Sequence, residues 1–359
     1  MKKALGRPLV LLLIAALGVS ALVATTAMAT SKTSKASVQV CVLLPDTKSS
    51  VRWVQFDAPD FAKALKAAHV TYSITNALND PQKQKAQAQA CLAAGAKVVV
   101  ETALDNGSAS AIEKLFTSAG GHAIDYDRQV IGGTASVYVT IDGKAVGEAQ
   151  ANGIIKALEA SGKMSSKPVV AELWGGQTDQ NAFWFKSGND AVLNPLFSQG
   201  HITKGPQQFV PDWLATNAGP IFAQMLVKTN NKIDAAIAAN DNIAGAVVAD
   251  LKARNLSPIP LSGQDATPQG VQYILAGWQT GTVYKYVPAE AKAAANAAVA
   301  LLHNQKPESN GTRKNGSKNE PTNALPVIWI TKANYQRLFS DGFLKKNQVC
   351  IGEYAKYCK

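Results

Sequence analysis

The sequence has few of the residues that most often carry metal or nucleophilic chemistry. Its 359 residues include four histidines and four cysteines. The histidines are spread along the chain, so no cysteine–histidine cluster has the spacing of a zinc site. No serine or cysteine forms a recognisable pair with a histidine base, and there is no glycine-rich phosphate-binding loop. The sequence therefore predicts no metal site, no catalytic nucleophile and no cofactor.

Blocks of positive charge are also missing. The formal net charge is +11, but the lysines and arginines are scattered along the chain rather than grouped. Phosphate binding requires the positive groups to gather on one face, so scattered charge is typical of a solvated surface. We expect no nucleic-acid partner.

The first residues have the pattern of a secretory signal peptide. A basic start is followed by the apolar run "PLVLLLIAALGVSALVA" and by small residues that end at Ala29. We predict a signal peptide over residues 1–29 and a flexible N-terminus over 30–37, and hence an exported protein that is periplasmic, or extracellular and associated with the cell envelope. A retained membrane anchor is the alternative, although no cysteine follows the apolar run to take a lipid.

Export makes disulfides possible for the four cysteines. The segment "CIGEYAKYC" favours a small loop closed by Cys350 and Cys358 at the C-terminus. Cys41 and Cys91 are either a second bonded pair or two buried free thiols.

Short apolar strand candidates alternate with helix candidates along most of the chain. "VQVCVLL" precedes the helical "APDFAKALKAAH", and "VTYSIT" precedes a helix that we expect to begin after Asp80 and to stop at Gly95. Such alternation predicts an α/β fold with parallel strands, crossover helices and strands buried on both faces.

The pattern restarts after about a third of the chain, which predicts two α/β lobes. Three segments are candidates for crossing between them: "SVYVTID", "GTVYKYV" and "ALPVIWI". The boundaries that follow are 38–140 with 285–325 for the first lobe, and 141–284 with 326–359 for the second. The polar stretch "QKPESNGTRKNGSKNEPTN" is predicted to be a loop or a mobile linker.

Polar and aromatic side chains follow the predicted strands, where open parallel sheets bind ligands. The segment "DYDR", which ends with Asp127 and Arg128, is the densest example. Paired hydrogen-bonding groups and flat aromatic faces suit a neutral polyol. The strand-end candidates are Asp46 to Trp53, Asp127, Arg128, Asp179, Asn181, Asp212, Trp213, Asn240, Asp241, Gln264, Asp265 and Lys285.

Each of these residues also has a structural interpretation. Asn240 and Asp241 could cap a helix, and Asp127 with Arg128 could form a local ion pair. The tryptophans could pack in a core, and Asp265 could be a turn residue. Their joint placement at strand ends in both halves favours a binding site.

Four segments, taken in order, resemble those of periplasmic-type sugar-binding proteins of ABC importers. They are "DYDR", "AANDNIAGAV", "SGQDATPQGVQYILAG" and "TVYK", and the D-xylose-binding group is the most similar. "LLPDTKSSVRW" resembles the first binding loop of actinobacterial xylose-type receptors. The resemblance implies a type I periplasmic-binding-protein fold, with two Rossmann-like lobes joined by three crossovers.

The same resemblance implies the ligand and the partner. It implies a monomer that holds one monosaccharide, xylose or another pentose, and delivers it to the permease subunits of an ABC importer. The contact residues it implies are Arg52, Trp53, Asp127, Arg128, Asp179, Asn181, Trp213, Asn240 or Asp241, Asp265 and Lys285. By strand alternation, Asp125 is expected to be a deeper structural residue, and Tyr126 to pack against a helix.

Two other classes of function compete with this hypothesis. An exported sugar-active enzyme needs only a suitably spaced carboxylate pair. The arginine and lysine among these acids argue against it, because they would hold the carboxylates ionised. A receptor for another small polar ligand that feeds a signalling pathway is the remaining alternative.

Overall fold

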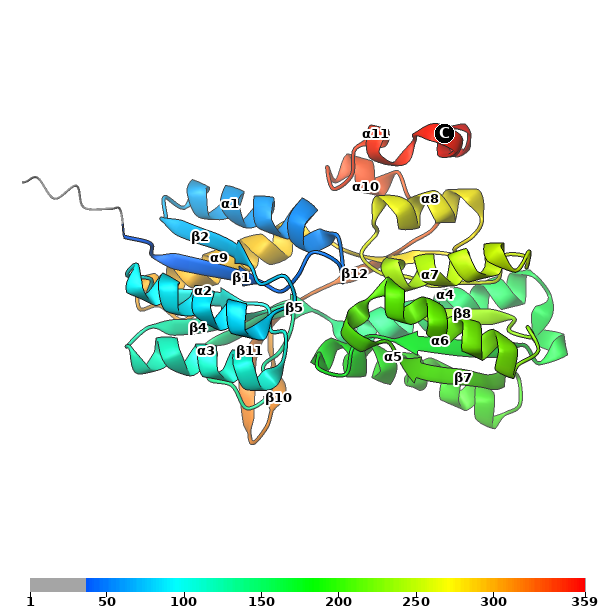
Figure 1. The fold of residues 1–359 in the computed structure, drawn as a ribbon, viewed down its shortest axis with the longest axis horizontal. Helices are drawn as coiled ribbons and strands as arrows, with labels where there is room; N and C mark the ends of the chain where they lie inside the picture. The colour runs from blue at the N-terminus through cyan, green and yellow to red at the C-terminus, as the bar shows by residue number, and fades with distance from the viewer. Residues whose placement is uncertain (1–36, 359) are drawn as a thin grey trace, which may run out of the picture. The chain divides into compact units, whose positions relative to one another are not determined.

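The computed structural model describes residues 37–358. The predicted signal peptide, 1–29, and all but the last residue of the predicted flexible N-terminus, 30–37, lie outside the described residues. Within the described part, strands and helices alternate as the sequence predicts (Figure 1).

The first sheet has seven strands in the order β10-β11-β5-β4-β3-β1-β2. Every neighbouring pair is parallel except the β10–β11 hairpin. The central strands β1, β3 and β5 are buried along their whole length, which explains why each reads as a nearly continuous apolar run. The strands are β1 (Val40–Leu44), β2 (Tyr72–Asn76), β3 (Val98–Glu101), β4 (His122–Tyr126), β5 (Val137–Ile141), β10 (Gly311–Asn315) and β11 (Lys318–Leu325).

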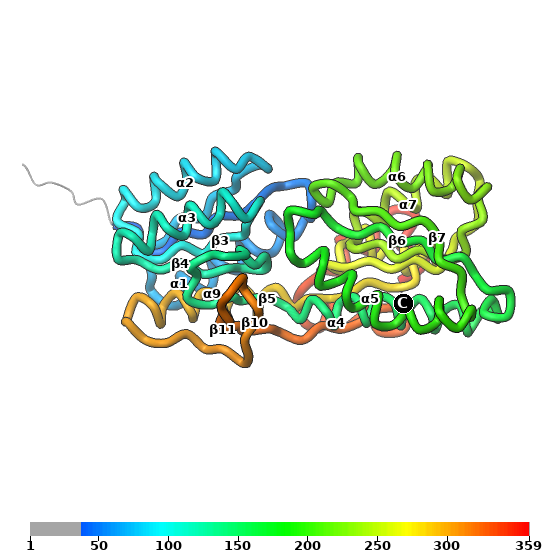
Figure 2. Tube along the Cα trace, turned by 90° about the horizontal axis from the view of Figure 1, so that it is seen from below, coloured from blue at the N-terminus to red at the C-terminus, as the bar shows by residue number. Residues whose placement is uncertain are grey.

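Helices cover both faces of this sheet. Helices α1 and α9 lie together on one face, and α2 and α3 lie on the other (Figure 2). The predicted ends of α2 are confirmed: the Asp80 carboxylate accepts hydrogen bonds from the backbone of Gln82 and Lys83, and Gly95 takes a φ of +97° after the last turn. The helices are α1 (Ala58–Ala67), α2 (Pro81–Ala93), α3 (Asn106–Ser118) and α9 (Val287–Leu302).

The second half is built around the parallel strands β7-β6-β8. Isolated bridges from Ala236 to Leu261 and from Gln264 to Val283 link these strands towards the antiparallel pair β9–β12. Helices α4 and α5 pack on one face, and α6 and α7 on the other. The elements are α4 (Gly143–Ala160), β6 (Val169–Trp174), α5 (Gln180–Ser198), β7 (Thr203–Phe209), α6 (Ala215–Lys228), β8 (Ala235–Ala238), α7 (Asp241–Ala253), α8 (Pro268–Ala276), β9 (Thr282–Lys285) and β12 (Val327–Ile330).

The chain passes between the two halves at the three segments that the sequence suggested. It leaves the first sheet after β5 to enter α4, and it returns from β9 into α9, whose alanines pack in the core of the first sheet. It crosses again between β11 and β12, which are separated by Pro326. The three crossings therefore lie between β5 and α4, between β9 and α9, and between β11 and β12.

The predicted loop over residues 305–323 is wrong. Strands β10 and β11 form a hairpin there, and β11 pairs in parallel with β5 (Figure 2). The hairpin lies at the edge of the sheet, and its buried positions hold polar side chains such as Asn315 and Glu320. Because these side chains are held by hydrogen bonds rather than by apolar packing, the sequence shows no apolar alternation at this place.

The last residues fold back over β9 and α8. They form α10 (Arg337–Ser340), α11 (Lys346–Val349) and the short 3₁₀ turn Gly352–Tyr357. The ring of Phe343 stacks on Phe56 at 4.3 Å and lies 4.9 Å from the ring of Tyr284. Among residues 37–358, no helix has both the length and the apolar character needed to cross a membrane.

All four cysteines are bonded. The predicted bond between Cys350 and Cys358 is confirmed, and Cys41 on β1 is joined to Cys91 on α2. The two bonds close loops of different size, because their cysteines are separated by 50 residues in one case and by 8 in the other.

The loop sizes give a prediction for stability. On the chain-entropy model, the longer loop contributes about 4 kcal/mol and the shorter about 2.5 kcal/mol to the free energy of unfolding. The double variant Cys41→Ala/Cys91→Ala should therefore unfold at lower urea concentration than Cys350→Ala/Cys358→Ala. A larger loss in the C-terminal double variant would contradict this argument.

Candidate functional site

A small pocket lies where the loops after the strands of both halves meet. It contains every predicted contact residue except Asp241. The open space inside it is about 20 Å³, comparable to the volume that one water molecule needs. The residues that line it are Ser49, Ser50, Arg52, Trp53, Asp127, Arg128, Asp179, Asn181, Phe185, Trp213, Asn240, Gln264, Asp265 and Lys285.

The loop after β1 is shaped by Asp46. Its carboxylate accepts hydrogen bonds from the backbone N–H groups of Lys48 and Ser49, at 2.7 and 2.6 Å, and from the Ser49 hydroxyl. The chain then enters a π-helical turn, Trp53–Asp57, directly before α1. This local structure directs Ser50 and Arg52 into the pocket.

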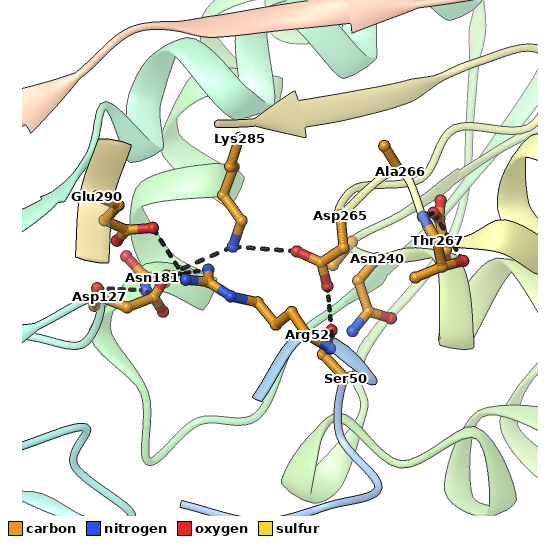
Figure 3. Close-up of polar contacts among 12 residues, drawn as sticks. Ser50, Arg52, Asp127, Asn181, Asn240, Asp265, Ala266, Thr267, Lys285 and Glu290 are labelled. Atoms are coloured by element: carbon orange, nitrogen blue, oxygen red, sulfur yellow. Dashed lines mark hydrogen bonds and ion pairs between the residues drawn. The ribbon is translucent and has the colours of Figure 1, made fainter. Parts of the chain in front are cut away.

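Arg52 is the most heavily paired side chain of the site (Figure 3). Its guanidinium contacts Asp57 at 2.6 Å, Asp127 at 2.6 Å and Glu290 at 2.9 Å. It is almost completely buried, with 1% of its surface exposed. Burial lowers the pKa of Arg52, but the three carboxylates outweigh this effect and raise it well above the usual value.

Asp127 follows β4 and has a φ of +62°, which is uncommon for a residue with a side chain. Its carbonyl oxygen accepts hydrogen bonds from the Tyr138 hydroxyl and from the Asn181 amide, both at 2.8 Å. Burial raises the pKa of the Asp127 carboxyl, but Lys285, Arg52 and Arg128 lower it to about 2. The carboxylate is therefore ionised at neutral pH and can act only as an acceptor.

Arg128 connects the same loop to the second half. Its Nε atom lies 3.0 Å from an Asp179 oxygen, and its Nη1 atom donates to the Ala103 carbonyl at 3.1 Å. The guanidinium also lies 5.5 Å from the centre of the Trp53 ring. Burial raises the pKa of Asp179, and the nearby Arg128 only partly offsets that rise.

Direct contacts from the loops after β1 and β4 to the second half close the pocket (Figure 3). The Ser50 hydroxyl donates to Asp265 at 2.7 Å, and the Asn240 amide donates to the Ser49 carbonyl at 3.0 Å. Lys285 lies between two carboxylates, 3.0 Å from Asp265 and 3.4 Å from Asp127. These contacts join the two halves of the fold across the pocket.

An aromatic wall completes the pocket. Trp213 has a φ of +59°, and its ring meets the Phe185 ring edge to face at 5.9 Å. A side chain at Gly175 would collide with the Trp213 ring, which explains the glycine at the end of β6. Among the described residues, the buried Trp213 Nε1 and Gln264 Oε1 atoms have no hydrogen-bond partner.

Asp241 is turned away from the pocket. Its carboxyl accepts hydrogen bonds from the Thr267 backbone at 2.8 Å and from the Gln279 amide at 2.9 Å, while Asn240 caps α7. Burial raises the pKa of Asp241 to about 7, although these hydrogen bonds lower it. Asp241 therefore does not line the pocket, in contrast to the expectation from the sequence.

The two residues that were expected to be structural in "DYDR" have that character. Asp125 is fully buried and accepts a hydrogen bond from the Val130 backbone at 2.7 Å. Tyr126 packs edge to face on Phe61 of α1 and donates to Asp57 at 2.6 Å.

Sequence reasoning missed two kinds of residue at the site. Phe185 lies one helical turn after Asn181, so helical spacing was the only available signal for it. Asp57 and Glu290 hold Arg52 from behind, and both read as ordinary acids near the start of a helix.

The chemistry of the pocket is that of reversible polar binding. It offers carboxyl acceptors, guanidinium and ammonium donors, amides and an aromatic face. In the part of the chain that the structure describes, no group of three or more acidic, histidine or cysteine side chains could hold a metal ion. The arrangement can bind a small molecule that carries several hydroxyl groups.

Comparisons with known proteins agree with the fold. The family model of the periplasmic binding protein domain matches residues 40–306. The D-xylose-binding periplasmic protein of Escherichia coli K12 is 32% identical over 300 residues, which cover 83% of this chain and 88% of that protein. The multiple sugar-binding periplasmic receptor ChvE of Rhizobium radiobacter is 30% identical over 321 residues, 84% of this chain and 90% of that receptor.

A solved structure of a solute binding protein has the same fold. The carbohydrate transporter solute binding protein of Chloroflexus aurantiacus, in complex with D-glucose, superposes with a TM-score of 0.77 at 27% identity. The match covers 87% of this chain and 98% of that one. The expected fold is confirmed, and the chain belongs to the periplasmic binding protein family, which is a family of binding proteins rather than enzymes.

Proposed function

We propose that this protein captures one monosaccharide in the pocket around Asp127 and Arg128 and delivers it to an ABC importer. A pentose such as xylose is the first candidate. The observation that carries the proposal is the enclosed set of charged and amide groups opposite an aromatic wall, with the Trp213 indole nitrogen and the Gln264 amide oxygen still unpaired.

The sugar would replace contacts that the pocket residues now make with one another. Asp127 and Asp265 can accept hydrogen bonds from sugar hydroxyls, while Arg128 and Lys285 can donate to them. The Trp213 ring can cover the C–H face of the sugar ring. A hydroxyl that is missing from a competing ligand leaves its partner unpaired, which gives selectivity.

The small volume of the pocket means that capture includes an opening step. The contacts from Ser50 to Asp265 and from Asn240 to the Ser49 carbonyl must separate before a sugar can enter. The proposed lobes comprise 38–140 with 285–325 and 141–284 with 326–359, and the three crossovers between them act as the hinge. The mature protein acts outside the cytoplasm as a monomer, and its partners are importer permease subunits.

Two related proteins support the choice of ligand. One is named for D-xylose binding and the other for binding several sugars. Calorimetric titration with xylose, ribose, arabinose, glucose and galactose tests the proposal directly. Xylose at 100 to 1,000 times its dissociation constant should stabilise the fold by about 3 to 4 kcal/mol. If no sugar of the panel changes the melting temperature, the monosaccharide proposal is wrong.

Removal of Arg128 should weaken sugar binding far more than it weakens the fold. Arg128→Ala deletes a charged donor and leaves Asp179 without its cation, so we expect affinity to fall by about 2 to 5 kcal/mol. Titration calorimetry measures the loss, and Arg254→Ala, at an exposed position that does not line the pocket, is the matched control. Wild-type affinity combined with a lower melting temperature would make Arg128 a structural residue.

The Asp241→Asn variant tests whether Asp241 affects the stability of the fold without contacting the sugar. The folded state holds the Asp241 proton up to a pKa of about 7, higher than in the unfolded chain, where aspartate titrates near about 4. The stability that this proton provides is present at low pH and is lost as the pH rises through that window. Urea unfolding should therefore show wild type losing stability relative to Asp241→Asn between about pH 4 and pH 7. Sugar affinity should be equal in the two proteins, and a large loss in the variant would return Asp241 to the contact set.

A further inference from the structure

The loop between β4 and β5, residues 127–136, carries Asp127 and Arg128. It is held by hydrogen bonds to side chains as well as by backbone hydrogen bonds. Four of its eight backbone N–H groups after Arg128 donate to a side chain, either from another part of the fold or from Asp125. The pairs are Val130 N to Asp125 Oδ2 at 2.7 Å, Ile131 N to Asn106 Oδ1 at 2.9 Å, Gly132 N to Asn315 Oδ1, and Thr134 N to Glu113 Oε2.

The β10–β11 hairpin supplies the longest-range supports of this loop. The Asn315 amide nitrogen donates to the Val130 carbonyl at 3.0 Å and to Glu320 Oε2 at 2.9 Å. The same Glu320 oxygen accepts from the Gln129 amide at 2.9 Å. Asn315 and Glu320 are 6% and 5% exposed, so water cannot easily replace these hydrogen bonds.

None of these supporting side chains reaches the pocket itself. They can influence a ligand only through the backbone position of Asp127 and Arg128. That position is demanding, because Asp127 has its left-handed φ and its carbonyl must receive the Tyr138 and Asn181 donors.

We propose that the β10–β11 hairpin, through Asn315 and Glu320, is a positioning element that fixes the binding loop and thereby sets the affinity of the pocket for its ligand. This inference rests on the proposed function, because it takes Asp127 and Arg128 as contacts of the sugar. Asn315 and Glu320 are positioning residues that never touch the sugar.

A cluster of acidic side chains lies behind the loop. Glu320 lies near Glu113 and Asp125, while Glu101 lies near Glu113 and Asp105. Burial, and then their mutual repulsion, raises the pKa of Glu101 and Asp125 well above the usual value. Among the described residues, no lysine or arginine forms an ion pair with Glu101, Glu113, Asp125 or Glu320.

The test compares three hairpin variants with one control at 25 °C. Asn315→Ala and Glu320→Ala should each weaken xylose binding by about tenfold, the effect of removing a support behind a ligand-holding group. Glu320→Gln keeps an acceptor for Gln129 and Asn315 and should bind almost as wild type. Thr312→Ala, at an exposed position of the same hairpin, should leave affinity unchanged. Amide hydrogen exchange at Val130 and Gly132 should accelerate only in the two weakened variants.

Two outcomes separate this inference from the proposed function. If Arg128→Ala loses sugar affinity while Asn315→Ala and Glu320→Ala bind as wild type with lower melting temperatures, the hairpin is merely structural and the inference is wrong. If Arg128→Ala also binds as wild type, the proposed site itself is wrong. Asn315→Ala leaves the hydrogen bond between Glu320 and Gln129 in place. If Glu320→Ala yields no folded protein, the sugar affinity of Asn315→Ala alone tests the inference.

Discussion

The buried guanidinium of Arg52 is the interaction on which the rest of the site depends. A buried charge is costly unless it is paired and hydrogen-bonded, and Arg52 meets this requirement with Asp57, Asp127 and Glu290. These carboxylates come from the turn before α1, from the end of β4 and from the first turn of α9. One cation therefore fixes three separate chain segments around the pocket.

The requirement that buried charges be paired also explains why a polar pocket can exist between two apolar cores. Buried ion pairs add little net stability when compared with apolar packing. Lys285 shares the carboxylates of Asp127 and Asp265, and Arg128 shares that of Asp179. In our account, sugar hydroxyls take over part of this pairing, and the charges are ordered before the sugar arrives.

Much of the fold and of the site follows from local sequence signals. Apolar strand runs, the Asp80 cap and the polar residues after strands such as β4 all predicted elements that the structure contains. The β10–β11 hairpin did not follow, because Asn315 and Glu320 are buried through hydrogen bonds and the sequence around them reads as a polar loop. Whether Asp241 faces the pocket also could not be predicted, since its partner Gln279 is distant in sequence.

The most direct test of the account is a crystal structure of the mature protein with xylose bound. We predict that sugar hydroxyl groups lie within hydrogen-bond distance of Asp127, Arg128 and Asp265, with the Trp213 ring against the sugar C–H groups. Arg52 should keep its contacts with Asp57 and Glu290. A sugar bound away from this pocket, with Arg128 still paired to Asp179 and Ser50 to Asp265 across an unoccupied site, would contradict the account.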